Sequence, residues 1–407
     1  MSLKQPLKPS IKLDNKDPSF SINDQPLLQR IHWFRLIYLS SMPLIAIYGA
    51  FTTKIVLKTA IFHVLYLILN SISITAGYHR YWAHRSFKAS KALQIFMTFS
   101  ACATVQGSIF WWCRDHRIHH RYTDTPKDPY NAKAGFFYSH IGWLFTKRDR
   151  RRLGYVDTSD LQADKLVMFQ NNYYLPLAIF FGYIVPICVC GLGWGDWRGG
   201  YYYACIWRMV YIHHSTFAVN SVAHYIGNLT YGDSTTAKDS VITALLTFGE
   251  GYHNFHHEFA NDYRNGIRFY HYDPTKWFIW FCSLAGLASD LKTFPENEIK
   301  KGYVEMKLRE ISKIQTTIDY GTPLEKLPLF TMDEFIAQVN KSNKQWIIIQ
   351  DVIYDVSSFT NEHPGGIPLL QNSVGKDVTE AFNGGVYNHQ KAARNLLAHL
   401  RVGSITA

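Results

Sequence analysis

Charged side chains are scarce in this chain of 407 residues, because Asp, Glu, Lys and Arg together make up only 18% of it. Hydrophobic residues make up 47% and aromatic residues 15%. Little charge and many aromatic rings argue against an ordinary soluble protein and favour a membrane protein with Trp and Tyr at the interfaces. A mean hydropathy of −0.12 indicates that a large polar part is also present. The length suggests two domains.

Cysteine is also sparse, and no two cysteines have the CxxC spacing of a redox or zinc motif. The six thiols lie in or near apolar segments: Cys102, Cys113, Cys188, Cys190, Cys205 and Cys282. We therefore expect a reducing compartment and no disulfide framework. The polar start of the chain lacks the apolar run of a signal peptide, so no such peptide is expected.

A separate basic stripe, typical of nucleic-acid binding, is missing as well. The net charge is +11, yet residues 326–407 hold seven basic and seven acidic residues, so the whole excess lies in residues 1–325, among the apolar runs. Basic residues beside apolar spans suit an anionic cytoplasmic leaflet and a phosphate-bearing substrate. We expect no nucleic-acid partner.

Four apolar stretches are long enough to cross a bilayer, which takes about 20 helical residues. They are 33–53, 55–77, 172–193 and 201–223. A fifth stretch, 91–112, contains Gln106 and small residues and is predicted to be interfacial or re-entrant. Four spans place both termini on one side, and the basic run at 147–152 indicates that this side is the cytosol.

The chain divides by composition into four parts. Residues 1–28 are polar, 29–290 form the membrane domain, 291–325 form a charged helical linker, and 326–407 have the short strands and turns of a small soluble domain. We find no internal repeat.

Histidines gather in three clusters: HRYWAH (His79, His84), HRIHH (His116, His119, His120) and HNFHH (His253, His256, His257). The segment NSVAH adds Asn220 and His224. On a helix, residues three and four apart share a face, so the second and third clusters and the Asn220–His224 pair each present ligands together. His79 and His84 are five apart, which suggests two adjacent metals or a helix that ends between them.

The clusters lie at the ends of spans, where ionisable groups are costly and usually functional. Nine imidazoles exceed what one four- to six-coordinate ion can use, so two metals are predicted. Imidazole suits zinc, copper, iron and nickel. We favour iron because the C-terminal part has the features of a redox domain and zinc has no redox chemistry. Ordinary packing remains the interpretation of His32, His63, His140, His213, His214, His271 and His399.

The order HxxxxH, HxxHH, HxxHH between apolar spans resembles the membrane fatty acyl desaturases. ITAGYHRYWAHRSF, RDHRIHHRYTDTPKDPYNAKAGFFYSHIGWL, NSVAHYIG and GEGYHNFHHEF are similar to the Δ9 acyl-CoA desaturases, over roughly residues 30–290. The resemblance implies two irons held by the nine histidines, with Asn220 acting through a water. It also implies a bent apolar tunnel for an acyl-CoA, desaturation at carbon 9, and CoA contacts by Arg114, Asp115, Lys147 and Arg148.

In the C-terminal part, SSFTNEHPGG places His363 before Pro364, Gly365 and Gly366, and His389 follows 26 residues later. The glycines permit close approach to a flat ligand, and the proline fixes the turn. With FTMDEF, YDVSSF and GKDVTEAFNGG, residues 326–403 resemble cytochrome b5. The resemblance implies heme b with His363 and His389 as axial ligands and His399 as the rival of His389. Two axial histidines leave an electron carrier that cannot bind oxygen.

The fold class expected is an all-α membrane domain, with about four transmembrane helices and a cytosolic helical cap, followed by a small α+β cytochrome b5-like domain. O₂ needs four electrons to become two waters. Two come from the substrate, and two must arrive singly through the tethered heme, with NADH-cytochrome b5 reductase as donor. The expected location is the endoplasmic reticulum membrane.

We predict no catalytic Ser, Cys or carboxylate beyond the metal ligands. Asp115, Asp128, Glu250 and Glu258 are candidates to orient the imidazoles, and residues near Leu67 and Ser71 are candidates to set acyl chain length. Two alternatives remain open: a fatty acyl or sphingolipid hydroxylase with similar metal chemistry, and a catalytically dead membrane electron carrier or lipid-binding protein.

Overall fold

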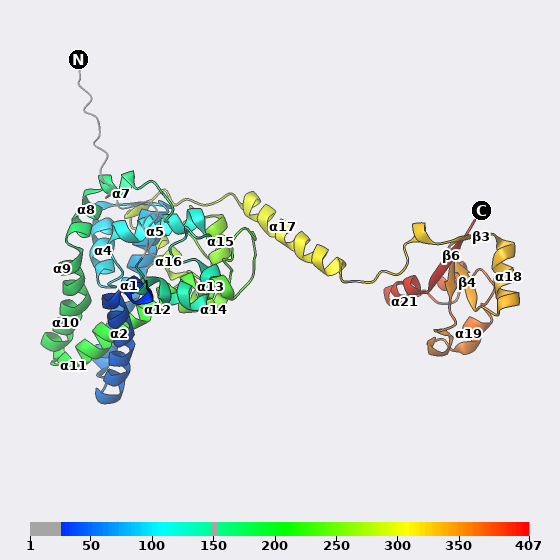
Figure 1. The fold of residues 1–407 in the computed structure, drawn as a ribbon, viewed down its shortest axis with the longest axis horizontal. Helices are drawn as coiled ribbons and strands as arrows, with labels where there is room; N and C mark the ends of the chain where they lie inside the picture. The colour runs from blue at the N-terminus through cyan, green and yellow to red at the C-terminus, as the bar shows by residue number, and fades with distance from the viewer. Residues whose placement is uncertain (1–25, 148–152, 407) are drawn as a thin grey trace, which may run out of the picture. The chain divides into compact units, whose positions relative to one another are not determined.

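The computed structural model describes residues 26–147 and 153–406. The chain forms two compact units, Met1–Leu308 and Arg309–Ala407 (Figure 1). The first is helical, and the second combines helices with a four-stranded sheet. The expected fold class, a helical membrane part followed by a small α+β domain, is confirmed.

Unit 1 is built from helices, several of which continue into tighter or wider helical turns, labelled η. In chain order these are α1 (Leu27–Arg30), α2 (Trp33–Thr52), α3 (Leu57–Ile72), η2 (Ser73–Ala83), α4 (Lys91–Cys102), α5 (Ile109–Tyr122), η3 (Ala132–Ala134), η4 (Tyr138–Gly142), α6 (Trp143–Phe145), α7 (Ser159–Ala163), α8 (Lys165–Asn172), α9 (Tyr174–Ile179), η5 (Phe180–Ile184), α10 (Val185–Trp194), α11 (Trp197–Gly199), η6 (Gly200–Trp207), α12 (Arg208–Asn220), α13 (Val222–Tyr225), α14 (Val241–Leu246), α15 (His253–Glu258) and α16 (Pro274–Leu284). Strands β1 (Lys88–Ala89) and β2 (Ala288–Ser289) pair antiparallel.

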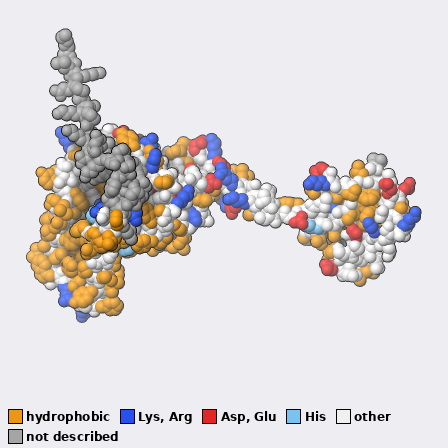
Figure 2. All heavy atoms as spheres, in the orientation of Figure 1, with side chains coloured by type: hydrophobic (Ala, Val, Ile, Leu, Met, Phe, Trp, Pro, Cys, Tyr) orange, Lys and Arg blue, Asp and Glu red, His pale blue; other side chains and the backbone are white. Residues whose placement is uncertain are grey.

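Three of these helices are long and apolar enough to cross a membrane: Trp33–Thr52, Leu57–Ala83 and Tyr174–Trp194. They correspond to the first, second and third predicted spans. Figure 2 shows hydrophobic side chains gathered over α2, α9 and α10. The fourth predicted span falls on η6 and α12, which follow one another over Gly200–Asn220 but contain Arg208, His213 and His214. That span therefore stays a prediction.

The buried charge of Arg208 lies at the start of α12, and its hydrogen bonds explain how the helix tolerates it. Its side chain is fully buried and donates to Asn70 Oδ1 at 2.8 Å, to the Ala103 carbonyl at 2.9 Å and to the Gly182 carbonyl at 3.0 Å. The guanidinium also lies 4.8 Å from the Tyr66 ring centroid. A buried polar group needs such partners, and here they tie α12 to α3, η5 and the end of α4.

The predicted re-entrant stretch 91–112 is not one helix. It consists of α4, a turn and the start of α5, with Ser90 and Ser108 capping the two helices. In the turn Val105 has a φ of +54°, which is unusual for a β-branched residue. The turn reverses the chain so that α5 carries its histidines toward η2.

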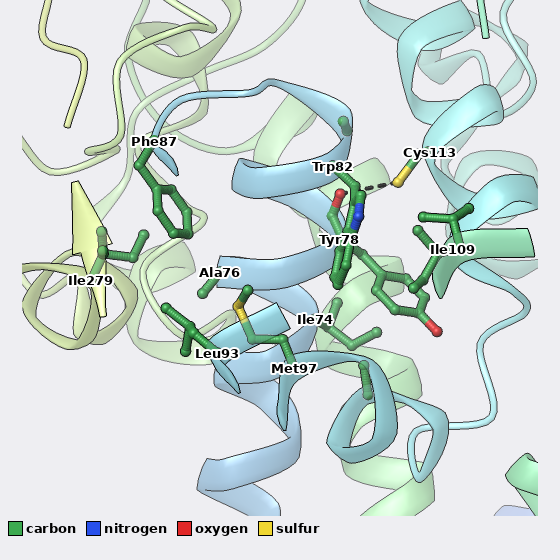
Figure 3. Close-up of a cluster of buried hydrophobic side chains, with 14 of the residues drawn as sticks. Ile74, Ala76, Tyr78, Trp82, Phe87, Leu93, Met97, Ile109, Cys113 and Ile279 are labelled. Atoms are coloured by element: carbon green, nitrogen blue, oxygen red, sulfur yellow. Dashed lines mark hydrogen bonds between the residues drawn. The ribbon is translucent and has the colours of Figure 1, made fainter. Parts of the chain in front are cut away.

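The second apolar helix changes from α to π geometry as it leaves the hydrophobic span. Over η2 each amide bonds five residues back, as the His84 amide does to the His79 carbonyl at 3.1 Å. Tyr78 and Trp82 pack into the main core with Met97, Ile109 and Cys113 (Figure 3). This packing turns the opposite face of η2, with its two histidines, toward α5.

Helix α17 (Glu296–Gln315) crosses the boundary between the units. Unit 2 then contains η7 (Leu324–Lys326), β3 (Leu329–Phe330), α18 (Met332–Ser342), β4 (Trp346–Ile349), β5 (Val352–Asp355), η8 (Thr360–Glu362), α19 (Ile367–Gln371), α20 (Thr379–Phe382), α21 (Lys391–Leu397), η9 (Ala398–Leu400) and β6 (Arg401–Ile405). The strand order is β3-β6-β5-β4, and β3 runs parallel to β6 while the other neighbours are antiparallel.

Two hydrophobic clusters hold unit 2 together, one on each face of the sheet. Alternate residues of the strands point into one cluster or the other. Phe335 of α18 packs with Trp346, Ile348 and Ile353, while Ile347, Ile349 and Tyr354 face the other cluster with helices α20 and α21. Thr331 and Glu334 form a capping box that starts α18. The N-terminal half of the domain is thus fixed independently of any ligand.

Replacing Phe335 by alanine should lower the free energy of unfolding of unit 2 by about 3–5 kcal/mol, because the ring is fully buried and leaves a cavity. Hydrogen exchange of the β4 and β5 amides should accelerate, while exchange in η2 should not change. Ile336→Ala is the matched control, because Ile336 is 43% exposed and should cost little. Equal effects of the two substitutions would contradict the assigned core.

Candidate active site

Nine buried or nearly buried imidazoles converge in unit 1, from α5, α13, α15 and the end of η2. They form two sets whose ring nitrogens lie within 4.8 Å of one another: His79, His84, His116, His120 and His256 (the first imidazole group), and His119, His224, His253 and His257 (the second imidazole group). All nine histidines singled out from the sequence are therefore brought together, and they divide into two sets. The number of sets matches the two metals expected.

Helix geometry decides how the residues divide. His116 and His120 are four apart on α5 and enter the first imidazole group, whereas His119 points to the second. On α15 the i,i+4 pair His253 and His257 enters the second group, and His256 enters the first. Each of these two helices therefore supplies both groups, which holds the groups side by side.

His79 and His84 belong to the same group, although five residues separate them. In an α-helix they would be about 140° apart. The π geometry of η2 brings them back onto one face, with ring centroids 4.8 Å apart. The expectation that these two residues serve separate metals is wrong, whereas the helix does end between them, because η2 ends at Ala83.

Asn220 and His224 are not on one helix. Helix α12 ends at Asn220, Ser221 has φ −121° and ψ −76°, and α13 begins at Val222. His224 reaches the second imidazole group, while Asn220 lines the cavity described below. The expected i,i+4 geometry of this pair is wrong, because the break reorients the chain between them.

Hydrogen bonds fix which nitrogen of several rings carries the proton. His79 Nδ1 donates to Glu250 at 2.9 Å, and His119 Nδ1 donates to Asp128 at 3.0 Å. Thr236 Oγ1 donates to Asp124, so His224 Nδ1 donates in turn to Thr236 Oγ1 at 2.9 Å. Each of these three rings therefore presents an unprotonated Nε2 to its group.

The Nε2 atoms within each imidazole group face one another at short range. The separations are 2.9 Å for His79 and His256, 2.8 Å for His84 and His116, 2.9 Å for His256 and His120, 3.2 Å for His119 and His257, and 3.1 Å for His257 and His253. Burial, and after it the neighbouring imidazoles, holds the pKa values of His84, His116, His120, His224, His253, His256 and His257 well below the usual range. Neutral rings with converging lone pairs fit two metal cations.

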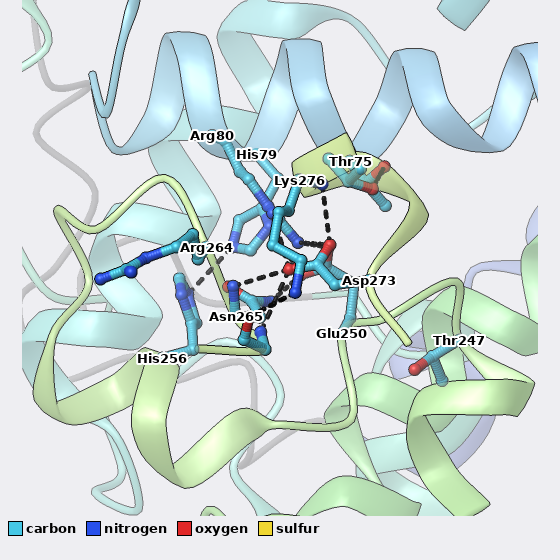
Figure 4. A network of polar contacts seen from close by, with 12 residues as sticks. Thr75, His79, Arg80, Thr247, Glu250, His256, Arg264, Asn265, Asp273 and Lys276 are labelled. Atoms are coloured by element: carbon cyan, nitrogen blue, oxygen red, sulfur yellow. Dashed lines mark hydrogen bonds and ion pairs between the residues drawn. The ribbon is translucent and has the colours of Figure 1, made fainter. Parts of the chain in front are cut away.

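A buried ionic network braces the first imidazole group (Figure 4). Arg80 donates to Glu250 at 2.8 Å and to Asp273 at 2.9 Å, and Asn265 Nδ2 donates to Glu250 at 2.6 Å. Burial alone would raise the pKa of Glu250, but Arg80 and His79 outweigh it and hold the value at about 2. The carboxylate therefore stays charged and fixes the His79 ring.

A cavity of about 750 Å³ adjoins the first imidazole group and is large enough for a lipid-sized ligand. Its wall contains His79, His116 and Asn220, and most of the remaining lining is apolar or aromatic, including Ile74, Val105, Trp111, Tyr183 and Phe217. Ser71 lines it, whereas Leu67 is not among the lining residues. The apolar lining of the cavity therefore extends up to the first imidazole group.

The four predicted CoA contacts have different positions. Asp115 lines the cavity and accepts from Arg114 at 2.7 Å. Lys147 is exposed and does not line the cavity, and Arg148 lies outside the described residues. Of the candidate orienting carboxylates, Asp128 and Glu250 accept from imidazoles, whereas Glu258 accepts from Ser234.

In unit 2, His363 and His389 face each other with ring centroids 6.4 Å apart. An iron between two imidazoles at about 2.0–2.1 Å from each nitrogen requires about this separation. His389 Nδ1 donates to the Phe382 carbonyl at 2.9 Å, and buried His363 Nδ1 has no partner among the described residues. His399 lies beside Asp319 instead, 3.6 Å away. These features fit heme and favour His389 over its rival.

Both glycines of HPGG lie where a side chain would not fit easily. Gly366 has a φ of +94°, and a Cβ on Gly365 would lie 2.7 Å from the His363 ring. Several site residues escaped sequence reasoning: Arg80, Asp124, Tyr130, Thr236, Asn265 and Asp273. The one available signal was that each imidazole needs a partner for its second nitrogen, which does not identify the partner.

Comparison with known proteins gives two family matches. Residues 57–282 match the fatty acid desaturase model, and residues 331–406 match the cytochrome b5-like heme/steroid binding domain. The chain is 48% identical to a probable acyl-CoA desaturase of Schizosaccharomyces pombe over 98% of its own length and 84% of the relative. It is 44% identical to acyl-CoA desaturase 1 of Saccharomyces cerevisiae (93% and 74%) and 34% identical to human stearoyl-CoA desaturase (71% and 82%).

Asp128→Asn should weaken metal retention about 10- to 100-fold, because one His119 acceptor is lost while the shape of the side chain is kept. Iron content after dialysis against graded chelator measures this, with circular dichroism to verify the fold. Glu258→Gln is the control and should retain metal normally, since Glu258 accepts from Ser234. Unchanged retention in Asp128→Asn would mean that His119 is not a ligand.

Proposed function

Because the chain belongs to the fatty acid desaturase family and is an acyl-CoA desaturase with a fused cytochrome b5 domain, we propose that it inserts a cis double bond at carbon 9 of palmitoyl- and stearoyl-CoA. An acyl-CoA substrate and O₂ follow from the family. Carbon 9 and the two chain lengths rest on resemblance to the Δ9 enzymes and are the proposal's finer part.

The observation that carries the proposal is the contact between the 750 Å³ cavity and the first imidazole group. Removing hydrogen from an unactivated methylene is beyond acid–base side chains and requires a redox cofactor. Here an apolar wall leads to His79 and His116, so a saturated chain in the cavity passes beside the imidazoles. Buried walls such as Trp143 and Phe217 keep bulk water away.

We assign one non-heme iron to each imidazole group, with Asn220 acting through a water. The irons supply O₂ activation when bound, and zinc would not. The protein's own residues orient the imidazole rings. Glu250 and Asp128 fix the His79 and His119 rings, and Thr236 fixes the His224 ring. No Ser, Cys or other carboxylate takes part in the reaction.

Electrons enter through heme b held between His363 and His389. A heme with two axial histidines is closed to O₂ and passes one electron at a time, which suits a donor that is reduced by NADH-cytochrome b5 reductase. A tethered domain also raises the effective concentration of the donor at the oxygenase. Two such electrons, with the two taken from the substrate, balance the reduction of O₂ to two waters.

For the CoA part we retain Arg114, Asp115, Lys147 and Arg148. The Arg114–Asp115 pair at the cavity wall supports the first two, and the other two rest on resemblance. We place the enzyme in the endoplasmic reticulum membrane with four spans and both termini and the heme domain in the cytosol. The proposed boundaries are 1–28, 29–290, 291–325 and 326–407.

Purified full-length protein supplied with NADH, cytochrome b5 reductase, O₂ and stearoyl-CoA should form oleoyl-CoA. Gas chromatography with mass spectrometry of the released acids identifies the product and its double-bond position. A hydroxylated acid without an alkene would favour the hydroxylase alternative. Absence of any product from iron-loaded enzyme would favour the dead carrier.

His363→Ala should stop reduction by NADH and abolish desaturation while leaving non-heme iron at the wild-type level, because the two centres have separate ligands. Heme absorbance and iron content give the two readings. His399→Ala is the control and should keep heme, since its ring lies beside Asp319. Loss of non-heme iron in His363→Ala would show that the assignment of separate centres is wrong.

Ser71→Leu should favour palmitoyl- over stearoyl-CoA. Ser71 lines the cavity, is 5% exposed and lies eight residues before His79, which is about 12 Å along a helix. A larger side chain there shortens the space beyond the reacting carbons. We expect the ratio of kcat/KM for the two substrates to change about tenfold, with Ser71→Ala as the control. An unchanged ratio would exclude Ser71 as a chain-length determinant.

A further inference from the structure

A second cavity lies on the other side of the third histidine cluster. It has a volume of about 440 Å³ and shares no lining residue with the substrate cavity. The lining side chains that matter here are Tyr231, Tyr252, Phe255, Asp239, Asn265 and His271. Of these, only Asn265 also braces the first imidazole group, through its amide nitrogen and Glu250, so the cavity is available to a ligand other than the acyl-CoA.

Aromatic rings form much of its wall. Tyr231 and Phe255 meet edge to face with centroids 5.4 Å apart, and Tyr252 stacks on His271 at 4.9 Å. Aromatic faces carry negative quadrupole charge and attract organic cations, most strongly where water is excluded. Tyr252 and Phe255 are buried, which meets that condition.

The polar atoms of the cavity are mainly acceptors. Asp239 accepts from the Phe255 amide at 3.0 Å, and burial raises the pKa of this carboxyl to about 6. Asn265 is 1% exposed, and its Oδ1 has no partner among the described residues; nor has His271 Nδ1. The lining contains no Lys or Arg. A carboxylate, an unpaired amide oxygen and aromatic rings together select for a cation.

The rim of the cavity is apolar and exposed. Val241 and Ile242 of α14 line it and are 59% and 69% exposed. Ser215 of α12 donates to the Leu246 carbonyl at 2.9 Å, which fixes α14 against the proposed fourth span near its cytosolic end. Phe269 and Tyr270 are 84% and 71% exposed on the adjacent loop. Exposed apolar and aromatic side chains at this level mark the membrane interface.

One basic residue is placed for an anion beside the cation site. Arg268 directly follows Ile267, which lines the cavity, and its side chain is exposed. A carboxylate inside and a guanidinium outside match a zwitterion whose anionic part stays near water.

We propose that this cavity binds the ammonium group of a zwitterionic membrane phospholipid, phosphatidylcholine or phosphatidylethanolamine, with its phosphate toward Arg268 and its acyl chains along α14. Because Tyr252 and Phe255 alternate with His253 and His256, the bound headgroup stabilises the helix that supplies ligands to both imidazole groups. The site is separate from the acyl-CoA cavity, so lipid binding is measured without reference to desaturation.

The test uses full-length protein in nanodiscs of phosphatidylcholine or of phosphatidylglycerol with the same acyl chains. Wild type should unfold at a higher temperature in phosphatidylcholine and should retain this lipid through detergent exchange, as counted by native mass spectrometry. Tyr231→Leu should lower retention about tenfold, the size of a desolvated cation–aromatic contact. Asp239→Asn keeps the shape of the side chain, removes the negative charge that faces the ammonium group, and should lower retention by at least as much.

Asp233→Asn is the matched control, because Asp233 is exposed, lies in the same loop and does not line the cavity. Its retention should equal that of wild type. Equal retention of the two lipids, or undiminished phosphatidylcholine retention in Asp239→Asn, would overturn the proposal. So would stabilisation by soluble tetramethylammonium with none by phosphatidylcholine, since that would assign the cavity to a free cation.

Discussion

Repulsion among lone pairs is the interaction on which the rest of unit 1 depends. Burial holds the pKa values of seven of the nine imidazoles well below the usual range. Ring nitrogens within each group face one another, and in the five closest pairs the separation is 2.8–3.2 Å. Without a cation this arrangement is unfavourable, so the surrounding protein must hold it. Buried ion pairs stabilise little by themselves, but they hold side chains in a defined geometry. Arg80, Glu250 and Asp273 form such a frame.

The frame ties together parts of the chain that are far apart in sequence. Arg80 on η2 meets Glu250 from the loop before α15 and Asp273 at the start of α16. Asp128 and Asp124, from the turn after α5, reach His119 and, through Thr236, His224. The imidazole groups therefore take this geometry only when the segments outside the three apolar helices, which carry these carboxylates and Thr236, are folded.

The sequence was sufficient for the histidines, the three long apolar helices and the small heme domain, because each has a local pattern. It was not sufficient for the parts that depend on tertiary contacts. The π geometry of η2 comes from packing of Tyr78 and Trp82, the break at Ser221 from the junction of α12 and α13, and the role of Thr236 from its distant partner Asp124. Nothing near these residues in the chain signals such roles. Asp115 and Glu258 carry the same charge as Asp128, so the sequence could not show that only Asp128 of these three accepts from an imidazole.

The wide turn of η2 has a consequence for redesign and for comparing sequences. With hydrogen bonds five residues back, a spacing of five places His79 and His84 on one face, whereas a regular α-helix would need a spacing of three or four. Deleting one residue between His79 and His84 would give the spacing of four that suits an α-helix. It would not bring the two histidines together, since Tyr78 and Trp82 would then leave the core. The five-residue spacing in HxxxxH thus reflects the wide turn of a π-helix. A designed protein built from ideal α-helices would need a different spacing between the two histidines.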